Sequence, residues 1–268
     1  MRSGLRTLKM RLVTGAKRLW YGSRGEPIRY GSHELRYIVG SRPVRLKYAT
    51  SGDMVARNDA RQIQFFIDNV HPGQLVLDIG GHYGEYAVLF AALVGPNGMV
   101  VSFEPDVAAR PMLQANLALN HFVERVQIES YAVFDTITSQ TLFTRHGNAQ
   151  SSLSRAGLGG QPSDDDVENY PVPTVRIDEY LRQAHLPMPD VIKLDVEGAE
   201  INALRGAGEV LSSKVTILCE LHPYAWPEFR TSFDDLLRVI ADHGRSIRYL
   251  DDDLRIENGP MYGAVVIS

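Results

Sequence analysis

Short apolar runs alternate with helical segments along most of this chain, and this alternation constrains the fold more than any other feature. The runs have the length of strands and cover residues 75–79, 99–103, 126–129, 191–194, 215–218 and 263–267. Helical patterns cover about 58–70, 85–94, 107–120, a segment from about 199, and 233–243. Continuously apolar strands that alternate with helices are typical of a parallel sheet buried on both faces. The sequence therefore predicts an α/β protein with a Rossmann-like, doubly wound, mostly parallel sheet.

Two segments do not follow this alternation. Residues 1–57 show no regular pattern, and we expect an N-terminal cap or lid segment before a main domain of residues 58–268. Residues 147–173 contain several glycines and prolines and the acidic run Asp164-Asp165-Asp166, which favours a solvated loop. A loop of this length inside a compact domain is also where a lid over a substrate is expected. We therefore predict an inserted lid segment there.

The first twenty residues are basic and contain Arg2, Arg6, Lys9, Arg11, Lys17 and Arg18 among leucines and Trp20. They lack the continuous apolar centre and the small-residue cleavage site of a signal peptide. We expect a peripheral helix or a dimer arm. A dimer arm would make the protein a homo-oligomer. Contact of an amphipathic helix with an anionic membrane surface is the alternative.

Composition narrows the class of partner. The 268 residues carry a formal net charge of −4, which gives no general electrostatic reason to bind nucleic acid. No apolar stretch approaches the roughly 20 residues that a transmembrane helix needs. The single cysteine, Cys219, lies in an apolar run and cannot form an intramolecular disulfide. We therefore expect an inert core thiol and a cytoplasmic protein.

A glycine-rich loop follows the first strand of the predicted sheet. It reads Asp78-Ile79-Gly80-Gly81-His82-Tyr83-Gly84 and leads into a helix. Glycines suit a tight turn whose backbone approaches a ligand closely. The glycine spacing of the loop departs from the dinucleotide-binding pattern G-x-G-x-x-G. Asp78 also places a carboxylate at the end of the strand, and a carboxylate suits a ligand with a cationic amine better than one with a pyrophosphate.

A second acid ends the next strand, in Phe103-Glu104-Pro105. Glu104 comes about twenty residues after the glycine loop, where an acid can accept hydrogen bonds from both ribose hydroxyls of an adenosine. A helix cap or a surface charge would explain either acid alone. Both acids in register on consecutive strands indicate an adenosine site at the carboxyl ends of the strands.

With these residues assembled, the chain resembles the class I S-adenosylmethionine-dependent methyltransferases, and within them the FkbM family. The likeness covers roughly residues 58–223. It rests on the glycine loop, on Phe103-Glu104-Pro105, on Ser151-Ser152-Leu153 and on the block Ile192-Lys193-Leu194-Asp195-Val196-Glu197-Gly198-Ala199-Glu200. The last block is the most diagnostic. The resemblance implies O-methylation of a hydroxyl on a small-molecule acceptor such as a sugar, a glycolipid or a polyketide.

The resemblance also implies roles for individual residues in cofactor binding. Asp78, Gly80, Gly81 and Gly84 would lie along the methionine half of S-adenosylmethionine, and Glu104 would hold the ribose. Ala132 would lie beside the adenine, with Tyr131 as a weaker candidate. The family's usual Gly-Ala-Asn becomes Gly80-Gly81-His82 here, so His82 stands where the loop asparagine is expected. Ser151-Ser152 would fold back over the site or form a plain turn.

Catalytic candidates follow the fourth and fifth strands. Asp195 ends one strand and Glu220-Leu221-His222 ends the next, so we expect Asp195 and Glu220 near each other at the catalytic edge. His222 has the unperturbed pKa that best fits proton removal near neutral pH, and we expect it to act as the general base. We expect Asp195 to lie close to the transferred methyl group, and Glu197 and Glu200 to cap the following helix.

A metal-assisted mechanism fits the same edge of the sheet. Asp195 and Glu220 could hold Mg²⁺, which would polarise an acceptor hydroxyl and favour its ionised form. Two protein carboxylates suffice only if water and substrate complete the coordination shell. The metal-free mechanism is therefore favoured.

Other activities share parts of this pattern. A nicotinamide-dependent oxidoreductase also uses a glycine loop and a ribose acid, but the glycine spacing, Asp78 and the block from Asp195 to Glu200 argue against it. A non-catalytic binding module has no support, since both predicted cofactor acids are present. A nucleic-acid methyltransferase would hold a flipped base with an Asn/Asp-Pro-Pro-aromatic tetrapeptide, and none follows the fourth strand.

Overall fold

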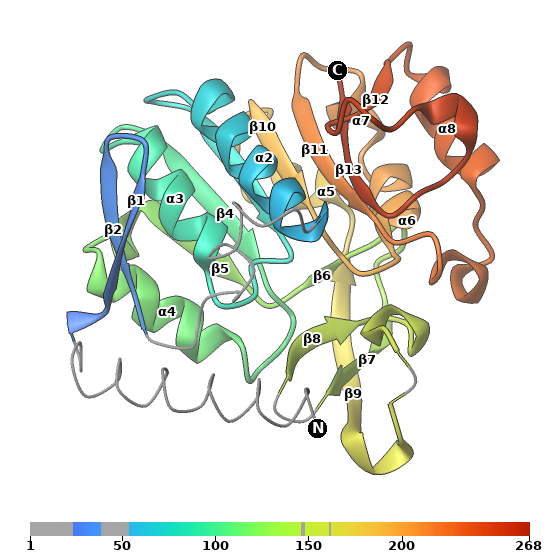
Figure 1. Cartoon of the computed structure of the whole chain (residues 1–268), viewed down its shortest axis with the longest axis horizontal. Helices are drawn as coiled ribbons and strands as arrows, with labels where there is room; N and C mark the ends of the chain where they lie inside the picture. Colours follow the sequence, from blue (N-terminus) through green and yellow to red (C-terminus); the bar gives the residue numbers. More distant parts are fainter. Residues whose placement is uncertain (1–23, 39–53, 146–147, 161) are drawn as a thin grey trace.

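A seven-stranded sheet forms the centre of the protein (Figure 1). The computed structural model describes residues 24–38, 54–145, 148–160 and 162–268. The strands lie in the order β12-β13-β11-β10-β3-β4-β5. They are β3 (Leu75–Ile79), β4 (Met99–Phe103), β5 (Val126–Glu129), β10 (Val191–Leu194), β11 (Thr216–Leu221), β12 (Ile247–Tyr249) and β13 (Gly263–Ile267).

The strand directions confirm the predicted Rossmann-like, mostly parallel sheet. Strands β5, β4, β3, β10 and β11 pair in parallel, and β13 is antiparallel to both of its neighbours. The chain moves outward from β3 through β4 to β5 and then returns to β10 on the other side of β3. Open α/β sheets bind ligands at such a switch point, outside the carboxyl ends of the strands.

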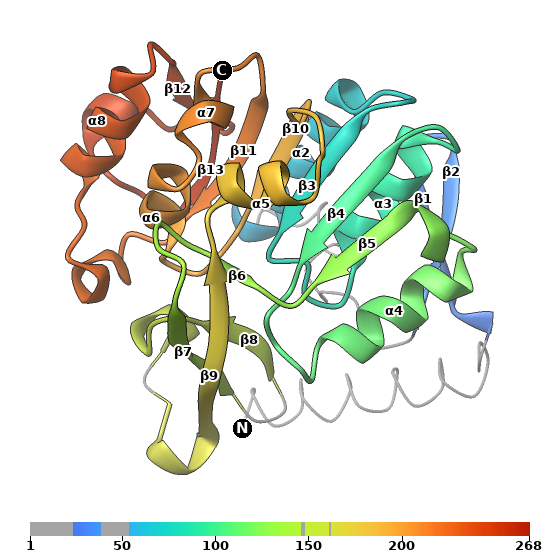
Figure 2. The same cartoon turned by 180° about the vertical axis from the view of Figure 1, so that it is seen from behind.

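Helices cover both faces of the sheet (Figures 1 and 2). One face packs against α2 (Met54–Asn69), α3 (Glu85–Val94) and α4 (Arg110–Leu119). The other face packs against α5 (Ile177–Gln183), α6 (Glu200–Arg205), α7 (Gly208–Leu211) and α8 (Phe233–Asp242). Short 3-10 turns occur at η3 (Val123–Arg125), η4 (Ala156–Leu158), η5 (Asp164–Asp166), η6 (Trp226–Phe229) and η7 (Ile256–Asn258). None of the helices in the described ranges is long and apolar enough to cross a membrane.

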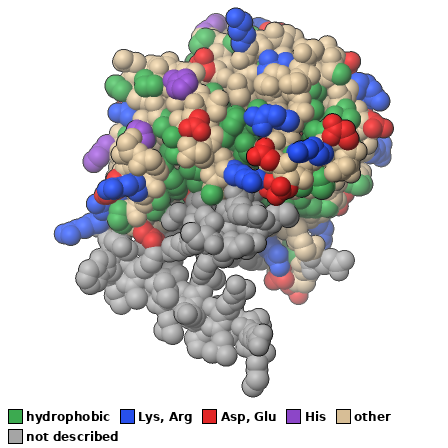
Figure 3. All heavy atoms as spheres, turned by 45° about the horizontal axis from the view of Figure 1, so that its top comes forward, with side chains coloured by type: hydrophobic (Ala, Val, Ile, Leu, Met, Phe, Trp, Pro, Cys, Tyr) green, Lys and Arg blue, Asp and Glu red, His purple; other side chains and the backbone are tan. Residues whose placement is uncertain are grey.

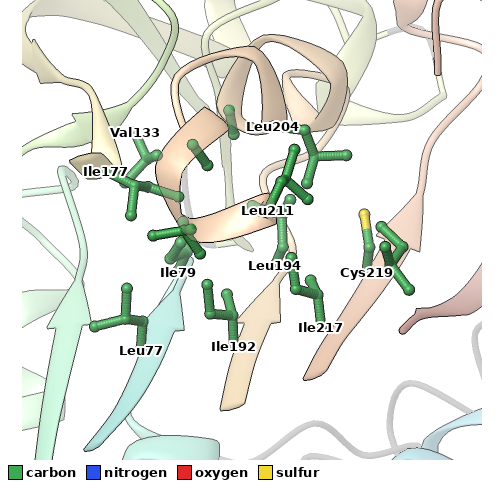
Figure 4. Packing of buried hydrophobic residues seen from close by; sticks show 14 of the residues in the cluster. Leu77, Ile79, Val133, Ile177, Ile192, Leu194, Leu204, Leu211, Ile217 and Cys219 are labelled. Atoms are coloured by element: carbon green, nitrogen blue, oxygen red, sulfur yellow. The ribbon is translucent and has the colours of Figure 1, made fainter. Parts of the chain in front are cut away.

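The larger core cluster lies between the sheet and α5–α8. Leu77, Ile192 and Ile217 point from three neighbouring strands toward Leu204 and Leu211 (Figure 4). Each of these side chains is almost completely buried, and burying one such side chain contributes about 1.5–3 kcal/mol. The Cys219 thiol lies in the same cluster, and it is buried and free as predicted.

A β-hairpin within the predicted N-terminal cap packs beside α3 and α4, and the last residues of that predicted segment, from Met54, already belong to α2. The hairpin consists of β1 (Glu26–Tyr30) and β2 (His33–Tyr37). The Tyr30 hydroxyl donates to Oε1 of Glu85 over 2.9 Å, and the Tyr37 hydroxyl donates to the Glu85 carbonyl oxygen over 3.0 Å. The hairpin is therefore joined to the start of α3, just after the glycine loop. The basic residues 1–20, and the role predicted for them, lie outside the described residues.

A second, four-stranded sheet projects from the main domain and replaces much of the loop predicted at 147–173 (Figures 1 and 2). Its order is β6-β9-β7-β8, with β6 (Ala132–Val133), β7 (Ser139–Arg145), β8 (Asn148–Ser152) and β9 (Val167–Val175). Pro171 and Pro173, which suggested a loop, are in β9. Because β6 pairs only with Thr174 and Val175, both prolines lie where β9 has a partner on one side alone.

Surface charge agrees with the composition. Acidic and basic side chains are interspersed on the face shown in Figure 3. Among the described residues, this face shows no extended basic patch of the kind that binds nucleic acid.

Candidate active site

The glycine loop lies against the ends of two neighbouring strands. The Gly80 and Gly81 N–H groups both donate to the Phe103 carbonyl oxygen over 3.0 Å. A Cβ atom on Gly80 would lie 1.9 Å from the Asp195 carbonyl oxygen, and one on Gly81 would lie 2.1 Å from Oγ of Ser102. Gly80 also has a φ of 85°, in the left-handed region. The two glycines are required because the loop touches β10 and β4 at once.

The loop ends where α3 begins. Gly84 has a φ of 82°, and a Cβ there would lie 3.0 Å from Cγ of Leu113 on α4. His82 also adopts a left-handed conformation, with a φ of 48°, and its ring stacks on Tyr83 at 3.9 Å between ring centres. His82 therefore occupies the predicted asparagine position at the turn itself, where it supplies a backbone N–H to the site.

Glu104 lies at the end of β4 and is buried. Its Oε2 accepts a hydrogen bond from the His82 N–H over 2.5 Å, and Oε1 accepts one from the Asp106 N–H over 2.7 Å. Burial raises the pKa of Glu104 to about 7, and the charges of Asp106 and Asp78 add to this effect against the two backbone hydrogen bonds. The carboxylate thus joins the glycine loop to the segment that leads into α4.

Asp78 and Lys193 are paired beneath the loop. Oδ2 of Asp78 accepts from the Ser102 hydroxyl over 3.0 Å, and Oδ1 lies 3.7 Å from Nζ of Lys193. Nζ donates to the Gly80 carbonyl oxygen over 3.0 Å and lies 3.4 Å from Oδ2 of Asp195. Burial raises the pKa of Asp78 despite this cation. Because Asp78 has no exposed surface, it supports the loop from below rather than lining an open surface.

A narrow cavity opens at the carboxyl ends of β3, β4 and β10. Its walls come from the glycine loop, from Glu104, which is predicted to bind the ribose, and from the β6–β8 region. The lining residues are Ile79, Gly80, Phe103, Glu104, Pro105, Tyr131, Ala132, Val133, Leu142, Ser151, Ser152, Leu153, Asp195 and Val196. A larger and more open hollow lies where β3, β10 and β11 begin, at the opposite edge, and none of the predicted site residues lines it. The cavity at the carboxyl ends is therefore the candidate site.

Asp195 connects this cavity to a buried histidine. Its side chain is 29% exposed, and Oδ1 lies 3.9 Å from Nε2 of His222. Burial alone would raise the pKa of Asp195, but the positive charges of Lys193 and His222 outweigh it and hold the pKa below its usual value. Asp195 is therefore ionised and is a weak proton acceptor.

His222 is held by a carboxylate from α6. Its Nδ1 lies 2.8 Å from Oε1 of Glu200, which also accepts from the Gly198 N–H, while Oε2 accepts from Nε1 of Trp226 over 2.9 Å. Burial would lower the pKa of His222, but Glu200, Glu197 and Asp195 raise it to about 10. The imidazole is therefore protonated at neutral pH, and its side chain is only 3% exposed. This environment does not suit the proton-accepting role predicted for His222.

Glu197 faces the other side of the histidine. Its Oε2 lies 3.3 Å from Nε2 of His222 and also accepts from Nε2 of Gln150 and from the Tyr224 hydroxyl. Burial, with the charges of Asp195 and Glu220, raises the pKa of Glu197 to about 7. The predicted helix-cap role is wrong for this residue, because α6 begins at Glu200 and the Glu197 side chain turns toward His222 instead.

Glu220 is engaged elsewhere. Oε2 accepts from Nε2 of Gln62 over 3.2 Å, and Oε1 accepts from the Tyr262 hydroxyl. Within the described residues, the acids and histidine that lie close enough to share a metal ion are Asp195, Glu197 and His222. Both oxygens of Glu220 therefore already accept hydrogen bonds, and the Mg²⁺ pair of Asp195 and Glu220 stays a prediction.

Comparison with known proteins identifies the family. A model of the methyltransferase FkbM domain matches residues 78–247. The chain belongs to the FkbM methyltransferase family. Residues 78–247 therefore form an S-adenosylmethionine-dependent methyltransferase domain, and the alternative of a nicotinamide-dependent oxidoreductase is excluded for it.

Curated relatives of this FkbM methyltransferase are distant. The hexuronic acid methyltransferase AglP of Haloferax volcanii is 22% identical, with 62% of this chain and 63% of AglP aligned. The 2-O-methyltransferase NoeI of Sinorhizobium fredii is 26% identical, with 60% and 67% aligned. The antimetabolite synthetase AmbE of Pseudomonas aeruginosa is 24% identical over 71% of this chain, which spans only 11% of AmbE. The chain thus covers less than two thirds of AglP and a small part of AmbE.

A solved structure of a methyltransferase FkbM from Methylobacillus flagellatus KT is 15% identical. The match covers 84% of this chain and 58% of that one, with a TM-score of 0.47.

The residues around the cavity fit S-adenosylmethionine. Gly80 approaches the Asp195 backbone too closely for any side chain, and the buried Glu104 carboxylate, which has further lone pairs for ribose hydroxyls, forms part of the wall. Ala132 and Tyr131 are both in the wall, on the β6 side. The wall thus offers apolar groups that suit a flat adenine and an acid that suits a hydroxylated ribose.

The sequence does not indicate the contacts of three further residues at the site. Lys193 belongs to the block that carries the family resemblance, and the pattern predicts that Glu197 and Glu200 cap a helix. The available signal was the lysine in an otherwise apolar strand, since a buried lysine needs carboxylate partners. Glu200 gave no such signal, because its contact with His222 joins residues 22 positions apart.

Proposed function

We propose that this enzyme transfers the methyl group of S-adenosylmethionine to a hydroxyl group of a sugar. The observation that carries the proposal is the cluster of Asp195, Glu197 and His222, whose polar atoms lie within 4.8 Å of one another beside the cavity. A hydroxyl acceptor needs a group that takes its proton, and this cluster supplies carboxylates where the predicted methyl-transfer point lies.

The acidic character of the site favours a hydroxyl over a carboxylate as acceptor. Asp195 is ionised, and Glu197 is ionised above pH 7. An acceptor carboxylate would be repelled by these charges and would need no base. The name of one relative agrees with this class of reaction, since NoeI is a 2-O-methyltransferase, and the name of AglP, a hexuronic acid methyltransferase, supports a sugar as the acceptor.

We assign the cofactor to the cavity in the predicted orientation. When bound, S-adenosylmethionine supplies an electrophilic methyl group on a sulfonium centre. Gly80, Gly81 and Gly84 shape the backbone along its methionine half, with Asp78 and Lys193 holding that backbone from below. Glu104 accepts hydrogen bonds from the ribose, and Ala132 lies beside the adenine. Asp195 faces the reacting end.

The acceptor would enter beside Tyr224. This side chain is 47% exposed, packs edge-on against His222 at 5.8 Å between ring centres, and donates to Glu197. An exposed aromatic ring next to acids suits the apolar C–H face of a sugar, whose hydroxyls can reach the carboxylates. Gln150, on β8, approaches Glu197 from the projecting sheet. That sheet therefore contributes to the acceptor side, where the sequence predicts a lid.

Transfer of labelled methyl groups to a panel of free sugars tests the proposal. Purified protein and S-[methyl-³H]adenosylmethionine are incubated with glucuronic acid, glucose, galactose, rhamnose and the methyl glycosides of each. We expect label in a sugar product that survives mild alkali, as an ether does. Label that mild alkali releases would show an ester and overturn the hydroxyl assignment. Absence of transfer to every sugar would overturn the sugar assignment.

A further inference from the structure

We propose that Glu197 is the general base, with Oε1 taking the proton of the acceptor hydroxyl while Oε2 is held by three donors. This inference rests on the proposed function, because only a hydroxyl acceptor needs a base.

The two oxygens of Glu197 have different surroundings. Oε2 receives the Tyr224 hydroxyl over 3.2 Å and both Nε2 of Gln150 and Nε2 of His222 over 3.3 Å. Oε1 accepts no hydrogen bond from any residue that the structure describes, and the side chain is 24% exposed. One oxygen is thus fixed in place and the other keeps its lone pairs available for a proton, which is the arrangement that a general base needs.

The other acids and the histidine of the site are less suited to this role. His222 is buried, and its two nitrogens face Glu200 and Glu197. Both oxygens of Glu220 accept hydrogen bonds from Gln62 and Tyr262. Asp195 has Lys193 within 3.4 Å of one oxygen and His222 within 3.9 Å of the other. Glu197 combines an oxygen held by three donors with one that accepts no hydrogen bond from the residues that the structure describes.

The backbone at Glu197 points to a role for its side chain. Its φ of 50° lies in the left-handed region, where glycine and asparagine are favoured and other residues cost about 1–2 kcal/mol. The turn itself therefore gives no reason for a glutamate. The same backbone is held by the Ser152 hydroxyl, which donates to the Glu197 carbonyl oxygen over 2.8 Å. Residues held in this way are often found at active sites.

The electrostatic surroundings give Glu197 a suitable proton affinity. The charged and titratable groups facing it are Asp195 from its own segment, His222 and Tyr224 from the segment after β11, and Glu220 from β11. Their sum, with burial as the largest contribution, brings the pKa of Glu197 to about 7. A base with a pKa near the working pH combines the correct protonation state with a useful driving force.

In the proposed step, methyl transfer to the acceptor oxygen is accompanied by loss of the acceptor's proton. An oxygen lone pair of the acceptor forms the new bond to the methyl carbon, and the sulfur–methyl bond breaks with its electron pair staying on sulfur. The acceptor O–H proton passes to Oε1 of Glu197. S-adenosylhomocysteine, the methyl ether and a protonated Glu197 result, and solvent then removes the proton.

The test compares Glu197→Gln with the wild-type enzyme on the sugar with the highest wild-type turnover. With S-adenosylmethionine saturating, we expect kcat to fall by roughly 10²–10⁴-fold, the usual contribution of a general base. Wild-type kcat should rise with pH through about 7 and then level off, because the base must be ionised. This limb should be absent in Glu197→Gln. S-adenosylhomocysteine affinity, measured by calorimetry, should be unchanged, which shows that the variant is folded.

Controls separate the possible results. Glu209→Gln, an exposed acid on α7 paired with Arg182, should leave kcat unchanged. Glu197→Asp should retain part of the pH limb, because a carboxylate remains. A Glu197→Gln enzyme with kcat within threefold of wild type would overturn the inference, as would loss of wild-type turnover in EDTA that Mn²⁺ or Mg²⁺ restores. A wild-type enzyme that binds S-adenosylhomocysteine but methylates no sugar would instead overturn the proposed function.

Discussion

Nδ1 of His222 lies 2.8 Å from Oε1 of Glu200, and both side chains are buried at the start of α6. Trp226 fixes the second oxygen of this carboxylate. The pair keeps the imidazole in one orientation, with Nε2 directed toward Asp195 and Glu197. A buried positive charge at this point lowers the pKa of Asp195 and holds Glu197 in place.

The first prediction concerns stability and pH. Because the folded pKa of His222 is raised from 6.5 to about 10, the stabilising effect of the pair is fully present below pH 6.5 and is lost as pH rises through 10. Glu200→Gln should lower the free energy of unfolding by roughly 3–5 kcal/mol at pH 7, since it leaves a buried group without its partner. The difference from wild type should shrink at pH 10. Urea unfolding at both pH values measures it, and an equal difference at the two would contradict the account.

The second prediction concerns the ribose carboxylate. Glu104→Gln should weaken S-adenosylhomocysteine binding by about 2 kcal/mol at pH 8, because charge-assisted hydrogen bonds to the ribose hydroxyls are lost. Burial and the charges of Asp106 and Asp78 raise the pKa of Glu104 to about 7, and Tyr83 lies nearby. In the wild type, affinity for S-adenosylhomocysteine should therefore fall as pH drops below about 7, because Glu104 becomes protonated. Calorimetry at several pH values, with circular dichroism to verify folding, checks both effects. A pH slope that survives in Glu104→Gln would assign it to another group.

The third prediction uses two glycines with nearly the same backbone conformation. Gly80 has a φ of 85° and Gly73 a φ of 87°, but a Cβ on Gly80 would lie 1.9 Å from a backbone oxygen and one on Gly73 would contact nothing within 4 Å. Gly80→Val should abolish cofactor binding, because the loop must move away from β10. Gly73→Val carries a similar backbone strain and should bind S-adenosylhomocysteine normally. Equal losses in both variants would show that close approach at the loop is not what matters.

The sequence predicted the elements whose signals are local. The apolar runs predicted the strands of the sheet, and the glycines predicted the loop. Glu104 was correctly expected at the end of its strand, because parallel strands end at a common edge. Helix α5 and the strand β12 were missed, since Ile177–Gln183 and Ile247–Tyr249 are too short to show a period. Strand β9 was not predicted because its prolines are typical of a loop. Proline is tolerated in a strand where the strand lacks a partner on one side, and the pairing of strands is not visible in the local sequence.

The arrangement of the catalytic cluster could not be predicted from the sequence. Asp195 and Glu220 end adjacent strands, which made them the natural pair. The turn at Glu197 instead directs that side chain toward His222. Gln62 on α2 and Tyr262 beside β13 donate hydrogen bonds to the two oxygens of Glu220. These contacts join residues far apart in the chain, and only the folded structure brings them together.

The fourth prediction concerns the metal. With Glu220 engaged by Gln62 and Tyr262, and with the protonated His222 between Asp195 and Glu197, we expect turnover to be unaffected by EDTA. Asp195→Ala should still lose most activity, because Asp195 faces the reacting end of the cofactor. Rates of labelled methyl transfer with and without EDTA test the first point. Wild-type turnover in Asp195→Ala would contradict the second.

A crystal structure of the protein with S-adenosylhomocysteine would show directly where the cofactor binds. We predict both ribose hydroxyls within hydrogen-bonding distance of Glu104, the adenine beside Ala132, and the sulfur directed toward Asp195. A ligand bound at the opposite edge of the sheet, or one whose ribose lies away from Glu104, would contradict this prediction.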